Sequence, residues 1–208
     1  MMESNYRCRK INSEILQTDI KKITLIACGT SAFACRIARF WFEEYANIAV
    51  NVDIASEYRY RKLLKTDNEV VIFISQSGES LDTLMALRYG KELGLKTNAI
   101  VNVEGSTIDR EVDYSLYTRV GPEIGVASTK SFTSQLVILF LIAVALGKKF
   151  NNLNTLQIEK KCQLMNMLPS AIANMLETEN QIKLIAQNIK NSKSVIFLGR
   201  GLLYTLAL

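Results

Sequence analysis

The 208-residue chain is 49% hydrophobic and 22% charged, with a formal net charge of +5. That length is enough for one globular domain with a sizeable core and some extra helices. The lysines are scattered, and no long arginine-rich run occurs. The excess positive charge therefore predicts a solvated surface and no nucleic-acid-binding face.

The cysteines and the absence of histidine also narrow the possible classes of protein. Cys8, Cys28, Cys35 and Cys162 form no C-x-x-C pair, and the chain has no histidine, so we expect neither a structural zinc site nor a cofactor. Unpaired cysteines without a signal peptide are typical of a protein in the reducing cytoplasm.

Taken in order, the chain alternates between apolar runs of strand length and segments of helical spacing. A polar segment, 1–20, is expected to be a linker or a short leading helix. Strands are predicted at 23–27, 50–54, 69–74, 97–103 and, as a short edge strand, 114–118. Helices are predicted at 32–45, 56–64, 80–93, 131–146, 155–176 and 179–190, and loops at 104–113 and 121–129.

This alternation predicts an α/β fold, a three-layer α/β/α sandwich on a mainly parallel, flavodoxin-like sheet of about five strands, with C-terminal helices added. The longest apolar run, 136–146, would span about 16 Å as a helix, whereas a bilayer core measures about 30 Å, so we expect a buried helix and no membrane contact. The predicted organisation is a main domain at 21–150 and connecting helices at 151–193.

The last residues repeat the beginning of the main domain. Residues 194–198 are expected to form a strand, Gly199-Arg-Gly201 a turn and 202–208 the start of a helix, matching the order of elements at 23–40. We therefore predict that 194–208 is the truncated start of a second domain of the same type.

The turn Ser75-Gln-Ser-Gly-Glu-Ser80 lies between a predicted buried strand and a predicted helix. Unpaired N–H groups at a helix start attract anions, hydroxyls add neutral donors, and Gly78 permits close approach. The alternative is that the serines only cap the helix. Three hydroxyls, a glutamine and a glycine exceed what a cap needs, so we favour a phosphate cradle. With no lysine and no G-x-G-x-x-G here, the ligand expected is a phosphate monoester.

Two other turns are expected at the same edge of the sheet. Cys28-Gly-Thr-Ser31 follows the first strand, and the loop 121–129 precedes a helix. Because ligands bind at the carboxyl ends of parallel strands, these segments are expected to complete the site.

Four other residues have side chains that could take part in chemistry. Cys28 is either a thiolate near a helix start or, as we favour without a histidine base, a packing residue. Glu79 is either a general base or, more in keeping with its position, a charge that complements the helix dipole. Lys130 is expected at a surface or an interface, with substrate contact as the alternative. Glu57 is either a helix-start charge or a polar anchor beneath the site.

Several motifs resemble those of the glutamine–fructose-6-phosphate aminotransferase (isomerising) family, also called glucosamine-6-phosphate synthases. They are Cys28-Gly-Thr-Ser31, Ile54–Arg61, Ser75–Ser80, Glu123-Ile-Gly-Val-Ala-Ser-Thr-Lys130 and Phe197–Gly201. The resemblance covers roughly residues 21–203, the first sugar isomerase (SIS) domain of the isomerase portion. S-x-S-G-x-[ST] marks such domains generally, and the Glu123–Lys130 stretch narrows the match.

The resemblance implies a site for hexose 6-phosphate, either fructose 6-phosphate or glucosamine 6-phosphate, in amino-sugar biosynthesis, and a homodimer. The residues it implies for substrate binding are Thr30, Ser31, Ser75, Gln76, Ser77, Ser80, Val126 and Ser128. It implies no catalytic residue here, because the family's lysine, glutamate and histidine have no matching position and the glutaminase domain is missing from this sequence. We expect a binding fragment that is inactive alone. The alternative is a non-catalytic regulator that senses sugar phosphates.

Overall fold

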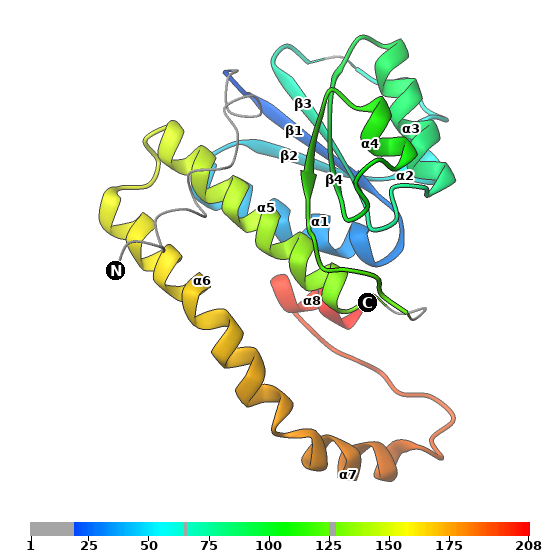
Figure 1. Ribbon diagram of the computed structural model, residues 1–208, viewed down its shortest axis with the longest axis vertical. Helices are drawn as coiled ribbons and strands as arrows, with labels where there is room; N and C mark the ends of the chain where they lie inside the picture. The colour runs from blue at the N-terminus through cyan, green and yellow to red at the C-terminus, as the bar shows by residue number, and fades with distance from the viewer. Residues whose placement is uncertain (1–18, 65, 125–127) are drawn as a thin grey trace. The chain divides into compact units, whose positions relative to one another are not determined.

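Five strands form one parallel sheet in the computed structural model, which describes residues 19–64, 66–124 and 128–208 (Figure 1). Their order across the sheet is β2-β1-β3-β4-β5. The strands are β1 (Lys22–Ala27), β2 (Ala49–Ile54), β3 (Glu69–Ser75), β4 (Lys96–Val101) and β5 (Tyr114–Tyr117). The predicted α/β fold is confirmed, including the position of 114–117 at the edge.

The register brings the carboxyl ends of the central strands to one edge. Ala27 of β1 lies opposite both Ile54 of β2 and Ile74 of β3. The chain moves from β1 outward to β2 and then returns to β3 on the other side, so the strand order reverses between β1 and β3. Such a switch point is the usual ligand position in an open α/β sheet.

Helices cover both faces of the sheet (Figure 1). One face carries α1 (Gly29–Trp41), the π-helical turn η2 (Phe42–Ala46) and α5 (Lys130–Lys149), and the other α2 (Ala55–Tyr58), α3 (Leu81–Glu92) and α4 (Thr107–Glu111). Successive strand residues face opposite ways. Ile72 and Ile74 therefore belong to the core under α1 and α5, and Val71 and Phe73 to the core under α3.

Helix α5 contains the apolar run predicted to be a buried helix. It is the one helix in the described part of the chain whose length and composition alone would let it cross a membrane. Leu139, Ile142 and Leu146 of α5 are buried in the core beside α1. A buried core helix can have the length and apolar composition of a membrane-spanning helix.

Two local predictions within this part are wrong. Residues 104–113 were expected to be a loop, but 107–111 form α4, a single turn held by the bond from Arg110 N–H to Ser106 O (3.0 Å) and by the buried Ile108. One turn is too short to show helical periodicity. The helix expected at 56–64 ends at Tyr58, whose side chain is buried in the core.

The chain divides after Asn152 into two compact units, and the second contains α6 (Thr155–Leu176), α7 (Glu179–Ile189) and α8 (Leu202–Ala207). Helix α6 begins with a capping box, in which Asn154 accepts from Gln157 N–H and Gln157 from Asn154 N–H, both at 2.9 Å. The strand predicted at 194–198 is wrong, since these residues are assigned to no strand. A strand requires a neighbouring strand for its N–H and C=O groups, which this unit does not supply among its described residues.

Candidate functional site

The turn after β3 presents hydroxyl protons to a ligand. Ser75, which is 3% exposed, accepts a hydrogen bond from Gly78 N–H (3.1 Å), and Ser77 Oγ accepts from Glu79 N–H (3.1 Å). A hydroxyl that accepts from the backbone still has its own proton to donate. Ser75 Oγ and Ser80 Oγ lie 3.1 Å apart, so one donates to the other and the pair keeps one free proton.

Helix capping does not account for these serines. Ser80 is the N-cap residue of α3, but within the described structure its side chain makes no capping hydrogen bond. The first intrahelical bond runs from Leu84 N–H to Ser80 O (2.9 Å), so the N–H groups of residues 81–83 precede any intrahelical partner. The turn therefore combines free backbone donors with free hydroxyl protons.

Gly78 fixes the shape of this turn. Its φ is +67°, and a Cβ atom at this position would lie 2.0 Å from Ser106 Oγ. Its carbonyl accepts from Ile108 N–H (3.0 Å), which ties the turn to α4. Only glycine fits both the backbone angle and the close approach of Ser106.

The turn after β1 lies beside the turn after β3, because Ala27 and Ile74 are paired at the ends of their strands. Gly29 has a φ of +54° and begins α1. Thr30 and Ser31 are half-buried in the first turn of this helix, which contains no acidic residue. Thus α1 and α3 both begin at the switch point.

Glu79 binds the start of another helix. Its Oε1 accepts from Thr107 N–H (2.7 Å), and this hydrogen bond is the main cause that lowers the pKa of the carboxyl group. The interpretation favoured from the sequence was a charge that complements the dipole of α3. The structure instead gives it the N-terminus of α4.

Glu123 collects the hydrogen-bond donors at the start of α5. Its carboxylate accepts from Ser131 Oγ (2.6 Å), Thr129 N–H (2.9 Å), Lys130 N–H (3.0 Å) and Ser128 Oγ (3.0 Å). The Ser131 hydroxyl, followed by the Thr129 N–H, lowers the pKa of Glu123 to about 2. The residues around the start of α5 are therefore organised around a negative charge that the chain itself supplies.

Asn102 joins the two parts of the site. Its backbone N–H donates to Gln76 O (3.1 Å), and its side chain accepts from Val120 N–H (2.9 Å) and donates to Gly121 O (3.0 Å). One residue after the end of β4, Asn102 thus fastens the turn after β3 to the connection that contains Glu123.

The structure places the predicted site residues as follows. Ser75, Gln76, Ser77 and Ser80 share one turn, Thr30 and Ser31 lie in the adjacent one, Ser128 lies before α5, and Val126 lies outside the described residues. Cys28 is half-buried against the core under α3, which agrees with a packing role. The Lys130 ammonium donates to Pro122 O (2.7 Å).

Asn102 and Glu123 were not singled out from the sequence. Asn102 lies near the carboxyl end of the strand predicted at 97–103, and Glu123 is the one acidic residue in the motif before α5. Both residues could have been noticed in the sequence from these positions.

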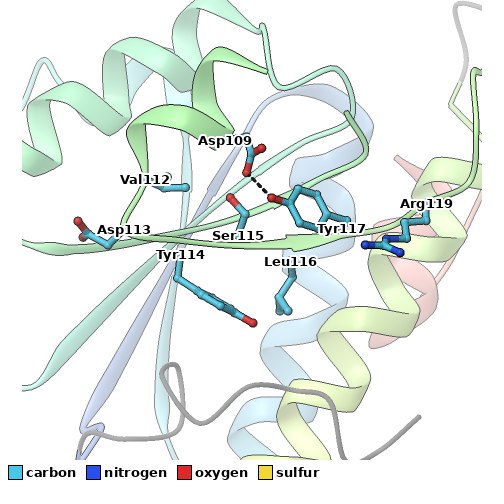
Figure 2. Close-up of a pocket in the computed structure, with 8 residues that line it drawn as sticks. All are labelled: Asp109, Val112, Asp113, Tyr114, Ser115, Leu116, Tyr117 and Arg119. Atoms are coloured by element: carbon cyan, nitrogen blue, oxygen red, sulfur yellow. Dashed lines mark hydrogen bonds between the residues drawn. The ribbon is translucent and has the colours of Figure 1, made fainter. Parts of the chain in front are cut away.

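A depression of about 620 Å³ lies elsewhere, along the edge strand β5 (Figure 2). Tyr117 Oη donates to Asp109 Oδ1 there (2.9 Å), and Arg119 lies at one end. A second, of about 380 Å³, lies around Lys22 and Glu69, where β1 and β3 begin. Neither is lined by the serines of the turn after β3. An edge strand with no neighbour leaves space beside it whether or not a ligand binds there.

The SIS domain family model matches residues 18–145 of this chain. The chain therefore belongs to the SIS domain family.

Its relatives include isomerizing glutamine–fructose-6-phosphate aminotransferases. It is 46% identical to that of Bradyrhizobium diazoefficiens over 190 residues, which is 91% of this chain and 31% of the relative. It is 42% identical to that of Bartonella quintana over 204 residues, 98% of this chain and 34% of the relative.

A solved structure, the C-terminal domain of glucosamine-fructose-6-phosphate aminotransferase from Francisella tularensis, superposes with a TM-score of 0.88 at 40% identity. The match covers 90% of this chain and 53% of that one. The resemblance read from the motifs is confirmed. The chain spans 31% and 34% of the length of the two curated relatives.

Proposed function

We propose that this chain is the sugar-phosphate-binding part of a glutamine–fructose-6-phosphate aminotransferase, and that it binds a hexose 6-phosphate between the starts of α1 and α3. One observation carries the position of the phosphate. The N-termini of α4 and α5 each bind a carboxylate of the chain, Glu79 and Glu123. Those of α1 and α3 receive no cap from Cys28 or Ser80 in the described structure. An external anion fits where no internal one is already bound.

The donors at this position suit a single phosphate group. The Ser77 hydroxyl, one proton of the Ser75–Ser80 pair and the first N–H groups of α3 are neutral donors. Asp82, also in the first turn of α3, is exposed. Each neutral donor to a charged phosphate contributes roughly 1.5–3 kcal/mol. The relatives named for fructose 6-phosphate support a hexose phosphate as the ligand.

Calorimetric titration tests this proposal. Fructose 6-phosphate, fructose and inorganic phosphate are titrated into the wild type, Ser77→Ala and Ser170→Ala, a control at an exposed serine of α6. We expect fructose 6-phosphate to bind best, fructose not at all, and Ser77→Ala to bind about tenfold more weakly or worse. Equal binding of fructose and its phosphate would refute the proposal.

We also propose that this chain alone does not turn its ligand over. Proton abstraction next to a carbonyl requires a base with a pKa near the working pH. In the described site, Glu79 and Glu123 accept backbone N–H bonds and their pKa values are lowered, that of Glu123 to about 2. Formation of glucosamine 6-phosphate from fructose 6-phosphate and ammonia by this chain alone would show the opposite.

Self-association is the third part of the proposal, and a homodimer is the form we propose. Helices α6 and α7 bury no residue within the described structure, and Leu164, Met167, Leu184 and Ile185 are 57%, 64%, 62% and 60% exposed. Apolar surface of this extent is typical of interfaces. A single species of monomer mass in analytical ultracentrifugation at high concentration would contradict it.

We propose the cytoplasm as the compartment. The thiols of Cys28 and Cys35 are free, as is usual in a reducing environment, and burial raises the pKa of Cys35. Cell fractionation with an antibody to this chain tests the compartment, and recovery from an oxidising compartment would overturn it.

A further inference from the structure

The hydroxyls around the start of α5 differ in their hydrogen bonding from those of the turn after β3. Ser128 Oγ and Ser131 Oγ lie 3.0 and 2.6 Å from Glu123 Oε2, while the N–H groups of Thr129 and Lys130 lie 2.9 and 3.0 Å from Oε1. All four groups share one carboxylate. The start of α5 is therefore filled by an anion of the chain itself.

The chemistry of these groups fixes the direction of each hydrogen bond. An ionised carboxylate only accepts, and a hydroxyl has one proton. Because hydrogen bonding lowers the pKa of Glu123 to about 2, the carboxylate is ionised at neutral pH. Ser128 must therefore donate its proton to Glu123, and it has only lone pairs left for a ligand. Ser77 is the reverse, since it accepts from Glu79 N–H and keeps its proton.

The two kinds of hydroxyl belong to one edge of the sheet. Asn102 donates from its backbone to Gln76 O in the turn after β3 (3.1 Å). Its side chain holds Val120 and Gly121, which lead directly to Glu123. A ligand that spans both connections contacts proton donors in the turn after β3 and proton acceptors before α5.

We infer that Glu123 is a positioning residue that sets the direction in which a sugar phosphate binds, by making Ser128 an acceptor for a sugar hydroxyl and excluding phosphate from the start of α5. The inference rests on the proposed function. The phosphate end binds at Ser75–Ser80, and the end that carries donating hydroxyls binds at Ser128. The favoured ligands are phosphate monoesters whose far end carries free hydroxyl groups.

The test compares two probes, fructose 6-phosphate and ethyl phosphate, a monoester with no hydroxyl. Both are titrated calorimetrically into the wild type, Glu123→Gln, Ser128→Ala, the double variant and Glu159→Gln, a control at an exposed carboxylate of α6. We expect Glu123→Gln and Ser128→Ala each to weaken fructose 6-phosphate binding by about three- to tenfold. Ethyl phosphate binding should stay within about twofold of the wild type. The double variant should be no weaker than the weaker single variant, because Ser128 acts through Glu123.

Each outcome decides the inference. Equal weakening of both probes, or additive losses in the double variant, would show that Glu123 only stabilises the fold, and would overturn it. If circular dichroism shows that Glu123→Gln does not fold, Ser128→Ala alone decides by its ratio between the two probes. If the wild type itself does not prefer fructose 6-phosphate to ethyl phosphate, the inference fails, because no part of the site then contacts the sugar. Failure of the proposed function would give a different result, which is equal binding of fructose and fructose 6-phosphate.

Discussion

Two strand-to-helix connections of similar composition have opposite hydrogen-bonding character. The turn between β3 and α3 has three serines whose acceptors are used by its own backbone or by each other. At the start of α5, the protons of the Ser128 and Ser131 hydroxyls go to Glu123 in the connection between β5 and α5. One acidic residue thus reverses what a hydroxyl-rich loop can bind. The number of serines before a helix is not sufficient to define an anion site.

The same contrast extends to other helix starts at this edge. Helices α4 and α5 receive Glu79 and Glu123, whereas α1 and α3 begin on either side of the β1–β3 switch point without such a partner among the described residues. The fold provides several positive helix ends, and internal carboxylates occupy those of α4 and α5. This difference directs the phosphate.

The largest effect is expected from closing the open turn with Gly78→Ala. A non-glycine residue at a φ of +67° costs about 1–2 kcal/mol, and the clash of the new Cβ with Ser106, 2.0 Å away, adds about 1–3 kcal/mol. We expect the free energy of unfolding to fall by about 2–5 kcal/mol in urea denaturation, with loss of measurable phosphate binding.

Gly105→Ala is the matched control for this change. Gly105 has a φ of +76°, and a Cβ there would meet no atom within 4 Å, so the variant measures the backbone cost without a clash. Phosphate binding by Gly105→Ala should be unchanged. Equal destabilisation by the two variants would show that the approach of Ser106 has no energetic weight.

An intermediate effect is expected from separating the two connections with Asn102→Ala. The variant loses the side-chain bonds with Val120 N–H (2.9 Å), Thr118 Oγ1 (3.0 Å) and Gly121 O (3.0 Å). At about 0.5–1.5 kcal/mol for each bond, the free energy of unfolding should fall by about 1.5–4.5 kcal/mol.

In calorimetry, Asn102→Ala should weaken fructose 6-phosphate binding more than inorganic phosphate binding, because only the sugar end depends on the connection before α5. Ser134→Ala, which removes a single side-chain bond to Lys130 O on α5, is the control. A uniform loss for both ligands would show that Asn102 supports the turn after β3 alone.

The sheet and the turn after β3 could be predicted from the sequence because both depend on local patterns. Apolar runs of strand length gave the five strands, and Ser75–Ser80 combined turn and donor residues in six positions. Helix α4 could not be predicted in this way, since one turn stabilised by the burial of Ile108 has no periodicity. The role of Glu123 depends on donors five to eight residues away that converge only after folding. The strand expected at 194–198 had a local pattern, but the described residues of its unit supply no neighbouring strand.

The smallest effect is expected from titrating the carboxylate that fills the start of α5. The pKa of Glu123 falls from an ordinary value of 4.5 to about 2 in the folded protein. A group whose folded pKa is depressed stabilises the protein above its unfolded pKa, and this contribution is lost as the pH falls towards the folded pKa. The Tm of the wild type should therefore exceed that of Glu123→Gln by a constant amount from about pH 8 to about pH 5.5. The difference should shrink below about pH 4.5.

Differential scanning calorimetry of both proteins across this range, with Glu159→Gln as a control at an exposed carboxylate, measures the difference directly. The control should match the wild type at every pH above about 5. Subtracting the variant from the wild type removes the titration of all other acidic groups, since both proteins share them. The remaining difference in Tm is due to the carboxylate of Glu123. A difference in Tm that grows as the pH falls, or that changes between about pH 6 and pH 8, would mean that Glu123 is not held ionised by Ser131 and Thr129, and that the contrast between the two connections has another cause.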